Sequence, residues 1–258
     1  MRGFTLIELI AVLVILGIVS AIGSQFVVSA VNSYSVSEKR SKLISRGRVT
    51  MEQMTRQFRN ALPNGLRVSA SGNCLEFFPV VTGANYLDSV ADADNGASGT
   101  TSIPTSPFTL GLGSPVHVFI GGLTLAEIYS TSNPAARADV AALTGSPTYA
   151  IGLSSAHVFV RNSLNKRVFI TDNPVRFCAV GNRLVEYSEY GLDTGNLDDA
   201  DPGGTTRLLA LGVSPAGQAF DLSPGSEDRN TAIDISLLFS ERGEQVNLNN
   251  TVLVRNVP

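Results

Sequence analysis

The sequence predicts an α+β protein, in which one long N-terminal α-helix packs on an antiparallel β-sheet domain with long loops. Two observations predict this class. Between Phe4 and Ala30 the chain carries one ionisable side chain, Glu8, and is otherwise apolar or uncharged. After Gly65 the hydrophobic pattern changes to alternation with a period of two, which is typical of strands. The chain therefore divides into a helical N-terminal part and a β-rich remainder.

The N-terminal part is long enough to cross a membrane. The uncharged run from Leu9 to Ala30 meets the requirement of about 20 apolar residues for a spanning helix. A lone carboxylate such as that of Glu8 costs about 2.5–3.5 kcal/mol in the bilayer centre, so it needs either water or a partner. One interpretation places Glu8 near the membrane surface. The other assumes that the chain is cleaved between Gly3 and Phe4, which would give Phe4 a new α-amino group. That amine could neutralise Glu8 of the same or a neighbouring chain.

The run Gly3-Phe4-Thr5-Leu6-Ile7-Glu8 resembles the class III signal of the type IV pilin family at every position. The resemblance implies cleavage between Gly3 and Phe4 by a prepilin peptidase, N-methylation of Phe4 and a role for Glu8 in filament assembly. It also implies a division into a leader (1–3), a transmembrane and filament-core helix (4–30), an amphipathic helix half (31–62) and a β-rich globular domain (63–258). Pilins often carry a proline within the membrane half. This chain has none there, which argues against a major, bulk-filament subunit.

A conventional signal peptide and a plain uncleaved anchor are the alternatives for the N-terminus. A signal peptide has a charged n-region and an apolar core of about 7–15 residues. Here the n-region holds only Arg2, the apolar run is longer, and Glu8 interrupts it. We expect the N-terminus inside the cell, although a basic cluster follows the span, because large domains are often translocated regardless of charge. The cluster consists of Lys39, Arg40, Lys42, Arg46 and Arg48. It is expected to form a solvated helix face, with lipid headgroups or acidic neighbours as the alternative.

The amphipathic half is expected to continue the same helix. Residues 31–61 contain no proline and one glycine, Gly47. Apolar residues recur there at helical spacing, which predicts one buried face: Ile44, Met51, Met54, Phe58 and Leu62. Pro63-Asn64-Gly65 is expected to end the helix at Leu62. A single helix from Phe4 to Leu62 would be about 85–90 Å long at 1.5 Å per residue.

The remainder is expected to contain short antiparallel strands, those between residues 157 and 187 forming a meander. Residues 83–114 are expected to be a long surface excursion, 134–143 a short helix and 191–206 an acidic loop. Strands are expected at residues 66–68, 74–80, 116–120, 157–161, 167–171, 175–180, 183–187, 207–213, 231–240 and 252–254.

Two cysteines, Cys74 and Cys178, are present in the chain. In an exported domain such a pair predicts one disulfide, with two buried free thiols as the alternative. On the chain-entropy model, closing a loop of about 100 residues contributes roughly 4–5 kcal/mol. The spacing is that of neither a redox motif nor a zinc site.

Neither the composition nor the motifs indicate catalysis. The formal net charge is −3 and the one basic cluster is short, so no nucleic-acid partner is expected. The chain lacks the GxSxG, HExxH and Walker A patterns, and its two histidines, His117 and His157, lie in apolar strands. We therefore expect no enzyme and no cofactor. The acidic loop is a weak candidate for a calcium site, and the alternative is that the loop is solvated. The weak candidate ligands are Asp193, Asp198, Asp199 and Asp201.

A second stretch refines the resemblance. Residues 51–64 and Cys74-Leu75-Glu76-Phe77 are similar to minor pilins of MSHA pili of the MshO type, which belong to the J-type pseudopilins. This resemblance implies a minor subunit that initiates or caps a filament. Its partners would be other major and minor pilin subunits, the prepilin peptidase, the inner-membrane assembly platform and the membrane itself. A pseudopilin of a type II secretion system, or an adhesin or DNA-uptake subunit, is the alternative.

The resemblance also implies a location. The protein would be a single-pass protein of the bacterial inner membrane, with its C-terminal domain in the periplasm, and would then pass into a pilus at the cell surface.

Overall fold

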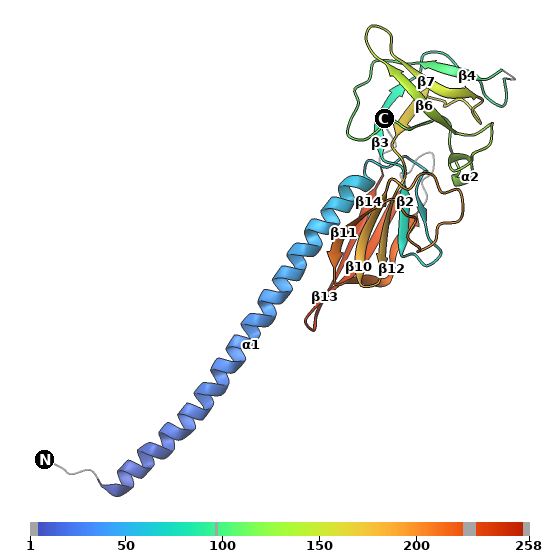
Figure 1. Ribbon diagram of the computed structural model, residues 1–258. Coiled ribbons are helices and arrows are strands. Elements are labelled where there is room, and N and C mark those ends of the chain that lie inside the picture. Colours follow the sequence, from blue (N-terminus) through green and yellow to red (C-terminus); the bar gives the residue numbers. More distant parts are fainter. Residues whose placement is uncertain (1–4, 96–97, 224–230, 255–258) are drawn as a thin grey trace.

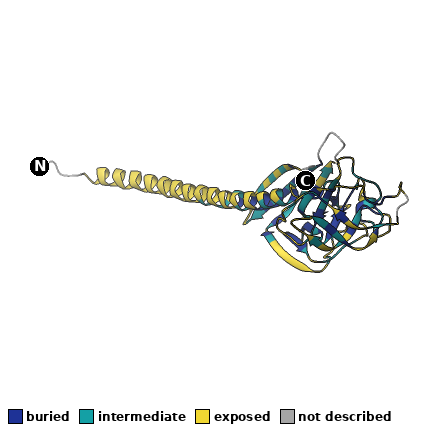
Figure 2. Ribbon diagram, turned by 90° about the horizontal axis from the view of Figure 1, so that it is seen from above, coloured by how far each residue is buried: buried dark blue, intermediate teal, exposed yellow. Residues whose placement is uncertain are grey.

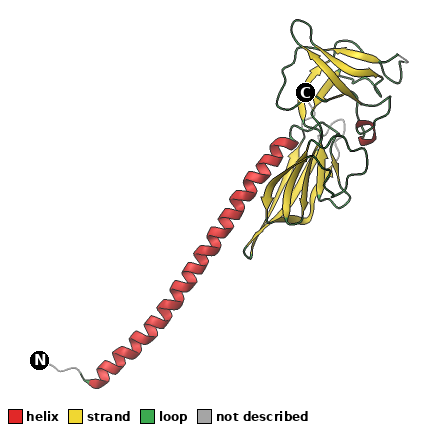
Figure 3. Ribbon diagram, in the orientation of Figure 1, coloured by secondary structure: helices red, strands yellow, loops and turns green. Residues whose placement is uncertain are grey.

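The computed structural model describes residues 5–95, 98–223 and 231–254, and it confirms the predicted fold class. One long helix, α1 (Leu6–Phe58), ends among antiparallel sheets that form two lobes (Figure 1). The first lobe, which we call the body, contains the C-terminal part of α1, β1, β2 and β9–β14. The second, which we call the barrel, contains β3–β8 and the short helix α2. Figure 3 shows that all strands lie at the C-terminal end of α1.

The body contains two antiparallel sheets. A five-stranded sheet has the order β1-β2-β9-β10-β11, and a three-stranded sheet has the order β12-β13-β14. The bounds of the first are β1 (Arg67–Val68), β2 (Cys74–Phe77), β9 (Val175–Val180), β10 (Arg183–Ser188) and β11 (Thr205–Leu211). Those of the second are β12 (Val213–Ser223), β13 (Ala232–Glu241) and β14 (Glu244–Leu253).

The buried stripe of α1 packs between these two sheets. It consists of Leu43, Gly47, Thr50, Met51, Met54 and Phe58. The Phe58 ring lies edge-on to Phe77 and Phe177, with ring centroids 5.3 Å away in both cases, and contacts Phe220 of the other sheet. At Gly47 the helix backbone passes so close to Leu248 and Phe239 that a Cβ atom would overlap the Leu248 side chain. The helix is therefore fixed where aromatic rings surround one face and where a glycine permits close approach.

The stripe differs from its sequence prediction at both ends. Ile44 is half-buried at the edge of the stripe, and Leu43 takes its place in the core. The helix ends at Phe58 and not at Leu62, because the following backbone pairs with the segment after β2. Leu62 N donates to Phe78 O, and Val80 N donates to Asn60 O, both at 2.8 Å. Leu62 thereby reaches a different apolar cluster.

The barrel is a six-stranded antiparallel sheet of order β3-β8-β5-β6-β7-β4. Its edge strands meet at Tyr86 and Thr105, which closes the sheet on itself at that end. The bounds are β3 (Val80–Asn85), β4 (Thr100–Pro104), β5 (His117–Phe119), β6 (Arg137–Thr144), β7 (Ala150–His157) and β8 (Arg167–Thr171). Its interior is a separate apolar cluster that includes Val118, Phe159 and Ile170.

The barrel is an insertion between two neighbouring strands of the body. Phe77, the last residue of β2, lies opposite Val175, the first residue of β9. The chain therefore leaves and re-enters the five-stranded sheet at one place. A junction cluster of Leu62, Phe78, Phe119, Ile128 and Tyr129 holds the two lobes together.

The short helix α2 (Leu125–Ile128) lies in the barrel beside this junction. Arg161 donates to both carboxylate oxygens of Glu127, at 2.6 and 2.8 Å, and to Gly121 O. These hydrogen bonds lower the pKa of Glu127 to about 2 against the opposing effect of burial. The pair fixes α2 to the strand-to-strand connection that carries Arg161.

Several predicted elements of the barrel region are wrong, for identifiable reasons. The sequence predicts a short helix at 134–143, but residues 137–144 form β6, whose Ala138 is buried in the barrel. The expected strand 74–80 is divided at Phe78-Pro79, where the chain passes from one lobe to the other. The segment 83–114, expected to be a surface excursion, contains the strand β4. The strand expected at 157–161 lies too late in the chain, because β7 ends at His157.

Other strand predictions agree closely with the structure. β8 and β9 begin and end at the predicted residues, but they do not pair, because β8 belongs to the barrel and β9 to the body. The alternation predicted for 231–240 places Ile233, Ile235, Leu237 and Phe239 in the core. The long strand β12 was not predicted, since Pro215 and Gly217 interrupt its pattern.

Phe58→Ala is expected to lower the free energy of unfolding by about 3–5 kcal/mol, because it removes a ring enclosed by three other rings. Urea unfolding of the detergent-solubilised chain measures the change. Arg48→Ala, at an exposed position of α1, is the control and should change the value by less than about 0.5 kcal/mol. Equal effects of the two substitutions would contradict the packing described here.

Candidate functional site

The N-terminal half of α1 forms an extended apolar surface with no cover from the rest of the described chain. Figure 2 shows it exposed from its start to the point where it reaches the lobes. Within residues 5–95, 98–223 and 231–254, α1 is the one helix that is long and apolar enough to cross a membrane. Large side chains such as Leu6, Ile15 and Phe26 lie open on it. Apolar surface of this extent needs lipid or other helices around it.

Glu8 lies in the first turn of this exposed helix. Its Oε2 atom accepts hydrogen bonds from Thr5 N and Thr5 Oγ1, both at 3.3 Å. A carboxylate at this position is also favoured by the partial positive charge of the helix N-terminus. Both bonds come from the same chain and lie in the open, so Glu8 is accessible to a partner. Gly3 and Phe4, the predicted cleavage and methylation residues, lie outside the described residues.

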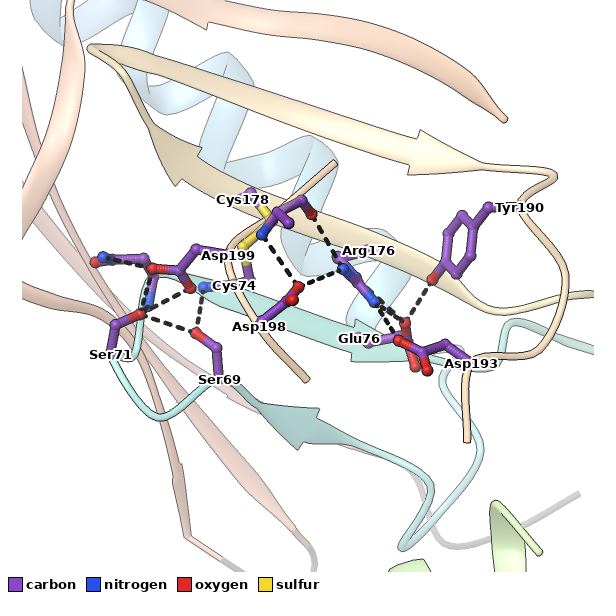
Figure 4. The surroundings of a disulfide bond; sticks show 12 residues. Ser69, Ser71, Cys74, Glu76, Arg176, Cys178, Tyr190, Asp193, Asp198 and Asp199 are labelled. Atoms are coloured by element: carbon purple, nitrogen blue, oxygen red, sulfur yellow. Dashed lines mark hydrogen bonds and ion pairs between the residues drawn. A yellow bond between two sulfur atoms is a disulfide. The ribbon is translucent and has the colours of Figure 1, made fainter. Parts of the chain in front are cut away.

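The second predicted site lies on the five-stranded sheet, on the face turned away from α1 (Figure 4). Cys74 of β2 and Cys178 of β9 lie directly opposite each other, with Cα atoms 4.2 Å apart, and form a disulfide, the pairing that the sequence predicts. Both cysteines are fully buried. Because side chains alternate across a strand, Glu76 and Arg176 lie on the same face, next to the disulfide.

Glu76 is a fully buried carboxylate between two arginines. Arg67 approaches its Oε1 atom to 2.6 Å, and Arg176 approaches Oε2 to 3.2 Å. Tyr190 also donates its hydroxyl to Oε2, at 2.8 Å. Burial opposes the charge of Arg176, but Glu76 and its neighbours outweigh it and raise the pKa of the guanidinium. Burial together with Glu76 raises the pKa of Tyr190, so its hydroxyl stays a donor.

The four aspartates proposed as weak calcium ligands have different partners. Asp193 and Asp198 reach Arg176, at 3.1 and 3.5 Å. The Asp199 carboxylate accepts from Ser71 Oγ, at 2.7 and 2.8 Å, and from Asn73 Nδ2. The Asp201 carboxylate accepts from Gly203 N within its own loop. Among the residues that the structure describes, no group of three or more His, Cys, Asp or Glu side chains is arranged to hold a metal ion. The acidic loop is therefore bound to the sheet by hydrogen bonds and ion pairs.

The two histidines also have structural contacts. His117 Nδ1 lies 2.8 Å from Asp139 Oδ1, and His157 Nε2 lies 3.1 Å from Ala135 O. Burial lowers the pKa of His117, which opposes its protonation.

The buried cluster of Arg67, Glu76 and Arg176 is not among the sites that the sequence predicts. A signal for it exists in the spacing. Glu76 lies two residues after one cysteine and Arg176 two residues before the other, so antiparallel pairing of the cysteines brings these two charges to opposite positions. Arg67 lies opposite Glu76 in the next strand.

Comparison with known proteins finds one match. The family model described as the prokaryotic N-terminal methylation motif matches residues 1–24. This motif is the type IV prepilin signal, and it supports a type IV pilin-like or pseudopilin-like protein, a class of structural subunits. The motif implies membrane anchoring, processing by a prepilin peptidase and assembly with other pilin subunits. No curated protein and no solved structure matches the chain.

Glu76→Gln is expected to lower the free energy of unfolding by about 3–5 kcal/mol, because it leaves two buried arginines without their shared carboxylate. Urea unfolding checks the value. The matched control is Glu52→Gln at an exposed position of α1, with an expected change below about 0.5 kcal/mol. A small effect at Glu76 would show that water satisfies the arginines as well as the carboxylate does.

Proposed function

We propose that this chain is a minor subunit of a type IV pilus of the MSHA-like kind, which initiates or caps the filament after processing by a prepilin peptidase. The observation that carries the proposal is the prepilin signal at residues 1–24, continued without interruption into an exposed apolar helix. The MSHA-like assignment rests on the resemblance of residues 51–64 and 74–77 to minor pilins of that pilus.

The chemistry of the N-terminus supports assembly through Glu8. Cleavage after Gly3 gives Phe4 a charged amine, which methylation keeps charged. When apolar helices bundle, Glu8 must leave water, and a buried charge without a partner is costly. Pairing of Glu8 with the Phe4 amine of a neighbouring subunit removes that cost. In the single chain Glu8 contacts only Thr5 among the described residues, through bonds that a new partner can replace.

The position of the barrel supports a place at the end of the filament. It lies beyond the C-terminal end of α1, on the side away from the N-terminus (Figure 1). In a filament whose helices run parallel, the next subunit along the axis would occupy the space beyond that end. A subunit whose barrel fills that space therefore fits best at the end of the filament, where no other subunit lies beyond it.

The orientation of the chain follows from the same proposal. The N-terminus lies inside the cell and both lobes lie in the periplasm before assembly. A buried disulfide suits that compartment, because disulfides persist in oxidising surroundings.

Deletion of the gene, with filaments and exoprotein secretion measured in the same strain, tests the function. We expect loss of surface filaments with normal secretion, and recovery of filaments when the gene is restored. Loss of secretion with normal filaments would assign the chain to a type II secretion system instead. Unchanged filaments and secretion would contradict an assembly role and favour adhesion or DNA uptake.

Glu8→Gln is expected to leave membrane insertion and leader removal intact while reducing incorporation into filaments by at least about tenfold, the factor for about 1.4 kcal/mol of lost charge pairing. Immunoblots of sheared filaments and of the membrane fraction measure both quantities. The matched control is Glu52→Gln. Normal incorporation of the Glu8 variant would refute the charge-pairing role.

A further inference from the structure

The five-stranded sheet of the body is covered on both faces. One face carries Leu75, Phe77 and Phe177, which belong to the core around α1. The other carries the disulfide and the buried charges. Residues 191–204, which we call the strap, belong to the connection between β10 and β11 and contact this second face. The acidic loop, for which the sequence leaves calcium binding or solvation open, thus covers the disulfide.

Polar anchors from the sheet hold the strap. Arg67 donates to the backbone carbonyls of Gly195, at 2.5 Å, and Asp193, at 2.7 Å. Arg176 donates to Ala200 O at 3.2 Å. At the other side of the disulfide, Asp199 binds Ser71 and Asn73 of the turn that precedes β2. Figure 4 shows Asp198 and Asp199 together with the disulfide and with the Arg176 and Ser71 side chains that they reach.

The apolar part of this cover is small. Leu197 is the strap residue that packs with Cys74, Cys178, Val185 and Tyr187. Leu192 contacts the junction cluster instead. The α1 side of the same sheet, in contrast, is held by a large core of aromatic and aliphatic side chains. The strap is therefore held mainly by bonds that water can replace, and such segments open at lower free energy than a core does.

The bonds of the strap differ in their exposure. The side chains of Asp193 and Asp198 are 40% and 69% exposed, so solvent and salt weaken their attraction to Arg176. Asp199 is half-buried. Burial opposes its charge, but hydrogen bonds from Ser71, Ser69 and Asn73 outweigh burial and lower the pKa of Asp199. Asp199 thus fixes the strap to the turn before β2 independently of the two arginines.

We propose that the strap is a gate for thiol chemistry at the Cys74–Cys178 disulfide. When closed, it excludes thiols from both sulfur atoms. It opens locally, without unfolding of the body, because its anchors are separate from the core around α1. The proposal does not depend on the function proposed above.

The reaction controlled by the gate is thiol–disulfide exchange with a dithiol. A thiolate of the dithiol attacks one sulfur, the S–S bond breaks, and the other cysteine leaves as a thiolate that takes up a proton. The second thiol of the reagent then displaces the first cysteine. The disulfide is thus reduced to two thiols, and the dithiol is oxidised to a cyclic disulfide. In the reverse direction, the bond forms while the strap is open, so oxidation precedes closure of the loop.

The test is the rate of disulfide reduction by dithiothreitol in the full chain, solubilised in detergent. Alkylation followed by mass measurement counts the thiols released. We expect Asp199→Ala to accelerate reduction by about tenfold, because Ser71 and Asn73 lose their shared acceptor. Asp88→Ala, an exposed aspartate of the barrel, is the matched control and should reduce at the wild-type rate.

Wild-type protein alone provides a second measurement, so the test stands even if the variant folds poorly. Reduction through strap opening should be faster than global unfolding, and its rate should depend less on urea than the global unfolding rate does. Global unfolding is followed by circular dichroism in the same buffer. Wild-type reduction at the rate of global unfolding, with the same dependence on urea, would overturn the proposal. So would an Asp199 variant that is folded and is reduced no faster than the Asp88 control.

Discussion

The enclosure of Phe58 by three other rings is the contact on which the rest of the structure depends. This ring joins α1 to both sheets of the body, because Phe77 and Phe177 belong to one and Phe220 to the other. The N-terminal half of α1 makes no such contact with the described chain. The segment from Arg40, which pairs with Glu244 of β14, to Phe58 therefore connects the helix to the lobes. A force on the apolar half, or a displacement of it, therefore reaches the lobes through that segment.

Two carboxylates of this molecule, those of Glu76 and Glu8, lie in opposite surroundings. Glu76 is enclosed by Arg67, Arg176 and Tyr190, so its charge is satisfied within the chain and stabilises one arrangement of the sheet. Glu8 is exposed and is held only weakly, so its charge is satisfied by whatever the helix meets next. Glutamate is thus structural where all its partners lie within the chain, and at Glu8 it is open to a partner outside the chain, as the proposed assembly role requires.

The sequence predicts those parts whose pattern is local. The apolar stripe of α1, the alternation in β13 and the ends of β8 and β9 follow from residue spacing alone. Spacing does not predict which strands pair, so the separation of β8 from β9 into two lobes was missed. The helix predicted at 134–143 is wrong, because pairing with β5 and β7 and burial of Ala138 in the barrel determine the structure of β6. The prepilin signal was accessible because its chemistry lies within six consecutive residues, whereas the cluster around Glu76 needs strand register to be found.

The entry and exit of the barrel at Phe77 and Val175 have a consequence for how such a chain can change. Since the two ends lie on neighbouring strands, the body requires only that the N-terminus and the C-terminus of the inserted segment lie side by side. Any independently folded unit with adjacent termini meets that condition. The molecule is thus divided into a body, which carries the helix, and a barrel that another folded unit can replace, so the barrel can diversify without changing the contacts that build the body.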